Sequence, residues 1–125
     1  MPAFPFDIVA FDLDGTLADT APDIAAAVNR MLADFGRPAL AEATIRPLIG
    51  DGAKNLLRKA LAATGEATDA LVEQAYPLYL DHYASNVCVG TVRYPAVEQA
   101  LDELTAQGVT LAICTNKPER LTQLL

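Results

Sequence analysis

Cysteine is scarce in this chain of 125 residues. Cys88 and Cys114 are the only two, and their positions do not form a metal-binding pattern. The N-terminus also lacks a basic and apolar leader, so we expect two reduced thiols, packed as core residues of a cytoplasmic protein. A scaffold held together by disulfides is therefore not expected.

Basic residues and long apolar runs are scarce as well. The chain has 9 Lys and Arg against 16 Asp and Glu, which gives a formal net charge of −7. This sign argues against nucleic acid or an anionic membrane as the main partner. No stretch approaches the ~20 consecutive apolar residues of a membrane-spanning helix, so we predict no membrane partner.

Apolar residues are plentiful, at 52% of the chain, which is enough for the core of about one domain. Two short apolar runs, residues 8–11 and 109–114, have the pattern of parallel strands that are covered on both faces. Apolar residues at helical spacing predict helices that begin near residues 20, 51, 68 and 95.

The distance between the two strands predicts an unusual arrangement of these helices. A parallel crossover needs only a dozen or more residues and one helix, so the helix from Pro95 is sufficient to join them. The helices between residues 20 and 86 are then not needed to connect the two strands. We therefore predict an α/β fold whose parallel sheet is interrupted after its first strand by an all-helical insertion.

Several residues have the character of helix ends. Thr20 and Asp23 have the spacing of a capping box, and Asp51 and Thr68 are expected to cap the next two long helices. Pro77 lies inside the apolar pattern of the helix from Thr68 and is expected to kink or break it.

Two carboxylates, Asp12 and Asp14, follow the first strand in "FDLDGT". Ligand sites of open parallel sheets lie outside the carboxyl ends of the strands, and "TNKP" occupies the same place after the second strand. A strand-end turn in which aspartates cap backbone amides is the simpler alternative. Such a turn accounts for one aspartate but not for two like charges close together.

These motifs resemble those of the haloacid dehalogenase superfamily. "FDLDGT" is similar to its first motif and "LAICTN" to its second, while "PLIGDGAKNLL", "YPAVEQAL" and "TNKP" resemble the bacterial phosphoglycolate phosphatases within it. The resemblance implies a Rossmann-like parallel-sheet core with an inserted helical cap. It divides the chain into core residues 1–19, cap residues 20–90 and core residues 91–125.

The resemblance also implies a chemical role for the residues of the two motifs. Asp12 would attack phosphorus and form an aspartyl-phosphate, and Asp14 would exchange protons with the leaving group and the hydrolytic water. An Asp12 oxygen and the Asp14 backbone carbonyl would hold Mg²⁺. Thr115 and Asn116 would bind the phosphoryl group. An acid at position 14 favours phosphoester hydrolysis over dehalogenation, because halide leaves without a proton.

The cap contributes candidates for substrate choice. Lys54 and Arg58, one helical turn apart, are placed to meet an anionic leaving group, as in 2-phosphoglycolate. A solvated basic face is an equally reasonable interpretation of this pair. His82 and the neighbouring tyrosines are expected to pack within the cap rather than to act in catalysis.

Two further motifs of the superfamily, a phosphate-binding lysine and an acidic pair, do not occur in the chain. Lys117 directly follows the second motif and is too early to be that lysine. We therefore expect the sequence to be the N-terminal part of a longer phosphatase, with weak or no activity alone. The alternatives are another small-molecule or sugar phosphatase, a phosphomutase, or a short non-catalytic relative that binds phosphate or a partner protein. The sequence does not predict an oligomeric state.

Overall fold

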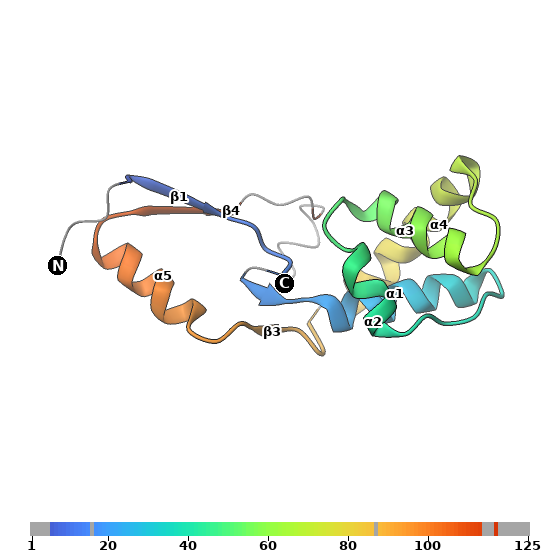
Figure 1. The fold of residues 1–125 in the computed structure, drawn as a ribbon, viewed down its shortest axis with the longest axis horizontal. Coiled ribbons are helices and arrows are strands. Elements are labelled where there is room, and N and C mark those ends of the chain that lie inside the picture. Colours follow the sequence, from blue (N-terminus) through green and yellow to red (C-terminus); the bar gives the residue numbers. More distant parts are fainter. Residues whose placement is uncertain (1–5, 16, 87, 114–116, 118–125) are drawn as a thin grey trace.

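The computed structural model describes residues 6–15, 17–86, 88–113 and 117. Figure 1 shows a parallel strand pair with one helix at one end of the molecule and a group of helices at the other. The elements, in chain order, are β1 (Ile8–Phe11), β2 (Ala18–Asp19), α1 (Ala21–Asp34), α2 (Glu42–Ile45), the 3₁₀ helix η1 (Arg46–Leu48), α3 (Ala53–Thr64), α4 (Asp69–Ser85), β3 (Val92–Arg93), α5 (Val97–Ala106) and β4 (Thr110–Ile113).

The two predicted strands pair in parallel, as expected. β1 and β4 are in register from Ile8 opposite Thr110 to Phe11 opposite Ile113, and α5 provides the crossover and packs on β4. The prediction that both faces are covered is wrong for the described residues, because Ile8 is 64% and Ile113 is 53% exposed. Within the described chain the strand pair therefore keeps apolar surface open to solvent.

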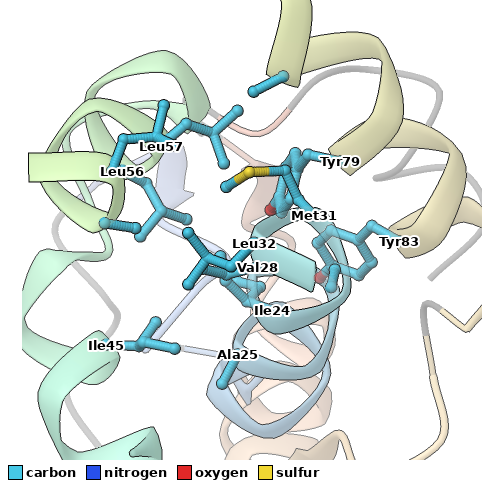
Figure 2. Packing of buried hydrophobic residues seen from close by; sticks show 14 of the residues in the cluster. Ile24, Ala25, Val28, Met31, Leu32, Ile45, Leu56, Leu57, Tyr79 and Tyr83 are labelled. Atoms are coloured by element: carbon cyan, nitrogen blue, oxygen red, sulfur yellow. The ribbon is translucent and has the colours of Figure 1, made fainter. Parts of the chain in front are cut away.

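The hydrophobic core lies in the helical insertion. α1 packs on α4, and α4 also packs on α3, so three helices bury apolar side chains against one another (Figure 2). The largest fully buried apolar side chains come from four elements: Val28, Met31, Leu32, Ile45, Leu57, Leu61, Val72 and Tyr83. None of the described helices is long and apolar enough to span a membrane.

A short antiparallel ribbon joins the insertion to the strand pair. Ala18 pairs with Arg93 and Asp19 with Val92, so β2 and β3 run side by side where the chain enters and leaves the helices. Strands of two residues are too short for a periodic pattern, which is why sequence reasoning missed this ribbon. It places the first turn of α1 next to the segment that returns from α4.

The capping box at the start of α1 is not formed. Thr20 is the N-cap residue but makes no side-chain cap hydrogen bond, and its hydroxyl donates instead to Asp14 Oδ1 at 2.6 Å. Asp23 instead accepts from the amides of Val89, Gly90 and Thr91 at 2.8 to 2.9 Å. Thr20 thus bonds a residue six positions earlier and Asp23 bonds residues 66 to 68 positions later, where the local pattern predicted bonds within the first turn of the helix.

The other helix-end predictions have mixed outcomes. Thr68 caps α4, accepting from the Leu71 amide at 3.1 Å, as predicted. Gly52, not Asp51, is the N-cap of α3. Pro77 does not break α4, which runs from Asp69 to Ser85 with the proline inside it. The expected core position of Cys88 is wrong, since this free thiol is exposed.

Candidate functional site

The loop after β1 holds its two aspartates in a tight turn. Leu13 is buried at 7% exposure and anchors the turn, while the amide of Leu17 donates to the Leu13 carbonyl at 3.1 Å. The Gly15 amide donates to the Ala18 carbonyl at 3.0 Å. Gly15 has a φ of +80°, which a residue with a Cβ rarely adopts, and this conformation lets the chain reverse directly after Asp14.

Asp12 lies at the carboxyl end of β1 and is exposed. The amide of the next residue, Leu13, donates to Asp12 Oδ1 at 2.8 Å. This hydrogen bond orients the carboxylate while its other oxygen faces no donor within the described residues. The side chain is therefore accessible to a ligand at the carboxyl end of the strand.

Asp14 is much more enclosed, with 15% of its side chain exposed. Its Oδ1 accepts from the Thr20 hydroxyl at 2.6 Å and lies 3.0 Å from Lys117 Nζ. The two aspartates thus differ in surroundings, one open and one held by donors from two other segments.

Lys117, which the sequence analysis judged too early to be the family's phosphate-binding lysine, contacts Asp14. Its side chain is only 2% exposed, and besides Asp14 it contacts the hydroxyl of Tyr83 at 2.5 Å. Burial lowers the pKa of Lys117, and the Asp14 carboxylate opposes that shift. Its position directly after the second motif was a signal that it could reach the strand ends.

An open pocket of about 190 Å³ adjoins Asp14. Arg46 of η1 lines it and pairs with Asp19 at 2.8 Å and with Glu42 at 3.0 Å. Asp19 and Glu42 raise the pKa of Arg46 by accepting its hydrogen bonds. The pocket therefore combines a carboxylate from the strand loop with a cation from the helical insertion.

Comparison with known proteins identifies the family. The model of the haloacid dehalogenase-like hydrolases matches residues 9–124. The chain belongs to this family. It is 49% identical over 116 residues to a phosphoglycolate phosphatase of Pseudomonas putida and 41% identical over 116 residues to one of Colwellia psychrerythraea. Each match covers 90% of this chain but only 42% and 51% of the relative, so the chain spans about half the length of these relatives.

Solved structures of the family have the same fold. A crystal structure described as a predicted phosphoglycolate phosphatase of Haemophilus somnus superposes with a TM-score of 0.84 at 34% identity, over 92% of this chain and 53% of that one. A structure from Lactobacillus delbrueckii has a TM-score of 0.87 at 24% identity and shows the fold alone. The Rossmann-like core, of which this chain holds part, is thereby confirmed.

The predicted substrate-binding residues of this haloacid dehalogenase-like hydrolase lie away from the pocket or outside the described residues. Lys54 pairs with Glu73 at 2.9 Å and Arg58 with Asp69 at 3.0 Å, and all four side chains are exposed. Neither cation lines the pocket that contains Asp14. Thr115 and Asn116 lie outside the described residues, so their phosphate-binding role stays a prediction. His82 pairs with Asp34 at 2.7 Å within the helical insertion.

The loop after β1 has a donor set that fits Mg²⁺. The loop's backbone hydrogen bonds among described residues end on the carbonyls of Leu13 and Ala18 and leave the Asp14 carbonyl for another partner. With the exposed Asp12 carboxylate it offers two hard oxygens, and Mg²⁺ is usually held by one or two carboxylates and several waters. Within the described part of the chain, no group of three or more acidic, histidine or cysteine side chains gathers to complete such a site.

Proposed function

We propose that the complete protein hydrolyses phosphomonoesters, with 2-phosphoglycolate as its substrate. The observation that carries this proposal is the pair of aspartates at the end of β1, with Asp12 exposed and Asp14 held on one oxygen by Thr20 and Lys117. Relatives that bear the name phosphoglycolate phosphatase, at 41% to 49% identity, support this choice of substrate.

The two aspartates have different tasks in the proposed reaction. An Asp12 oxygen attacks phosphorus, the bond from phosphorus to the ester oxygen breaks, and a proton from Asp14 passes to the departing alkoxide. Asp14, now a carboxylate, then takes a proton from water as the water oxygen attacks phosphorus. The bond from phosphorus to Asp12 breaks, inorganic phosphate leaves, and both side chains return to their starting states.

We assign Mg²⁺ to the Asp12 side chain and the Asp14 carbonyl. The bound ion would offset the negative charge that Asp12 and the phosphoryl group bring together. This chain's own residues orient the reacting groups: the Leu13 amide holds Asp12, and Thr20 holds Asp14. We also assign the phosphoryl oxygens to the Thr115 hydroxyl and the Asn116 amide.

A phosphate-release assay on the complete protein, with millimolar Mg²⁺, tests this proposal. We expect turnover of 2-phosphoglycolate that Asp12→Asn abolishes, because an amide does not attack phosphorus. Asp7→Asn is the matched control, since Asp7 is an exposed aspartate just before β1 and should turn over like the wild type. No turnover of any ester in a panel of small phosphomonoesters, or an active Asp12→Asn variant, would contradict the proposal.

Substrate choice is assigned to cations of the cap. We propose that Lys54 and Arg58 attract the carboxylate of the substrate, and we add Arg46 because it lines the pocket beside Asp14. Alanine at any of these positions should raise KM for 2-phosphoglycolate more than KM for a neutral phosphoester. Equal effects on both substrates would identify ordinary surface charges.

The reaction needs no nucleic acid or membrane partner, and the cytoplasm stays its predicted location.

A further inference from the structure

Lys117 brings a buried positive charge to the catalytic loop. Its side chain is 2% exposed, and an ammonium group removed from water is costly unless it has close partners. Those partners come from two segments far away in the sequence. Asp14 Oδ1 lies 3.0 Å from Lys117 Nζ, and the Tyr83 hydroxyl lies 2.5 Å from the same atom.

Tyr83 is a fixed partner, because α4 holds it inside the helical insertion. The residue is 1% exposed, and its ring packs edge-on against Tyr79 with 5.9 Å between the ring centroids. Lys117 Nζ also lies 4.3 Å from the centroid of the Tyr83 ring, within the range of a cation–π interaction. Lys117 therefore links the last turns of α4 to the loop that follows β1.

The hydrogen bonds to Asp14 are distributed unevenly over its two oxygens. The Thr20 hydroxyl and the Lys117 ammonium both contact Oδ1 rather than Oδ2. Two donors on one oxygen fix the rotation of the carboxylate. Among the described residues, these two contacts hold one oxygen of Asp14 and not the other.

We propose that Lys117 is a positioning residue for Asp14. Its ammonium, shared between Asp14 Oδ1 and the Tyr83 hydroxyl, holds the carboxylate in the orientation that proton transfer through Oδ2 requires, and it ties that orientation to the docking of α4. The inference rests on the proposed function, since that function gives Asp14 its protons to transfer. Lys117 itself acts through Asp14 and transfers no proton in the proposed reaction.

The kinetic test uses the complete protein and Lys117→Met, which keeps the length of the side chain and removes its charge. We expect kcat for 2-phosphoglycolate to fall by roughly 10²-fold, the loss typical of a misplaced reacting group, with KM nearly unchanged. The loss should be smaller for an aryl phosphate, whose leaving group needs no proton. Lys59→Met, an exposed lysine on α3, is the matched control and should behave like the wild type.

A double variant separates positioning from a general structural role. If Lys117 acts through Asp14, adding Lys117→Met to Asp14→Asn lowers kcat no further. A further loss in the double variant would overturn the inference, as would a Lys117→Met enzyme with wild-type kcat. Tyr83→Phe keeps the ring and removes the hydroxyl, so it should lower kcat in the same substrate-dependent way, with Tyr76→Phe as control. Tyr83→Phe also tests the inference if Lys117→Met fails to fold.

Amide hydrogen exchange tests the link without any substrate. Lys117→Met should speed exchange both at Gly15, Leu17 and Ala18 in the loop and in the last turns of α4, while Lys59→Met changes neither. Unchanged exchange at both places would overturn the inference even in an active enzyme. If the wild-type protein hydrolyses no phosphoester but Lys117→Met still speeds exchange at both places, the proposed function is refuted. The link between Asp14 and α4 is then retained.

Discussion

Asp12 and Asp14 are separated by a single leucine but differ in what surrounds them. Asp12 is exposed and accepts from the Leu13 amide, whereas Asp14 is largely buried and accepts from Thr20 and Lys117 on one oxygen. An open carboxylate suits attack on a ligand, and an enclosed one suits controlled proton transfer. The different surroundings thus match the two roles that we propose.

Asp23 is a third aspartate whose surroundings indicate its role, in this case a structural one. The residue is 5% exposed and accepts from the Val89, Gly90 and Thr91 amides and from the Thr91 hydroxyl. Burial alone would raise the pKa of Asp23, but the donors of Gly90, Thr91 and Val89 outweigh it and lower the pKa below its ordinary value of 3.8. Asp23 therefore fastens the chain that returns from α4 to the start of α1.

We expect Asp23→Asn to lower the free energy of unfolding by about 2 kcal/mol at pH 7, the usual loss for hydrogen bonds to a charged group. Because the folded pKa lies below the unfolded one, this stabilisation is complete above the unfolded value and is lost as the pH falls through the folded one. Urea denaturation at pH 7 and at lower pH should therefore show the difference from wild type shrinking in acid. Asp81→Asn, at an exposed position on α4, is the control, and an equal difference at every pH would contradict this account.

At the scale of the elements, the insertion derives its stability from the packing of α1, α3 and α4. Leu57 of α3 is fully buried in that core (Figure 2). Leu57→Ala should lower the free energy of unfolding by about 2–5 kcal/mol, because it removes buried methyl groups and leaves a cavity. Leu78→Ala on α4, where the side chain is 38% exposed, should cost much less in the same denaturation experiment. Equal losses would mean that α3 does not pack in solution as described.

The elements were largely predictable from the sequence, and the contacts between them were not. Apolar runs and helical spacing predicted β1, β4 and the long helices, because those patterns are local. The contact of Asp23 with Thr91 spans 68 residues, and that of Lys117 with Tyr83 spans 34. Local patterns carry no information on such pairs, so Thr20 and Asp23 were assigned to a capping box. Lys117 was judged only by its place in the sequence, too early for the family's phosphate-binding lysine.

At the scale of the whole molecule, the chain carries the proposed nucleophile, acid and cap. It spans 42% to 51% of the length of the relatives compared above, and the boundaries 1–19, 20–90 and 91–125 stay a prediction. The family resemblance fixed the identity of Asp12 and Asp14 as candidates. Only the structure shows which oxygen of Asp14 is held and which residues hold it.

We expect the 125-residue chain alone to hydrolyse 2-phosphoglycolate at least ~10³-fold more slowly than the complete protein. The lysine and the acidic pair expected from the family do not occur in this sequence, and losing a charge-stabilising donor typically costs ~10²–10³ in kcat. Phosphate release by the purified chain in millimolar Mg²⁺ measures this, with Asp12→Asn as the contamination control. Activity equal to that of the complete protein, and absent in that variant, would show that those motifs are dispensable.

In the proposed reaction Asp12 becomes phosphorylated during turnover, and chemical trapping can detect this phosphorylated residue. Borohydride reduces an acyl phosphate, so quenching the complete protein during turnover of 2-phosphoglycolate should convert Asp12 to homoserine, seen by mass spectrometry of the peptide that contains it. We predict this conversion only in the presence of substrate and not in Asp12→Asn. Turnover without conversion at Asp12, or conversion at Asp14 instead, would contradict the account.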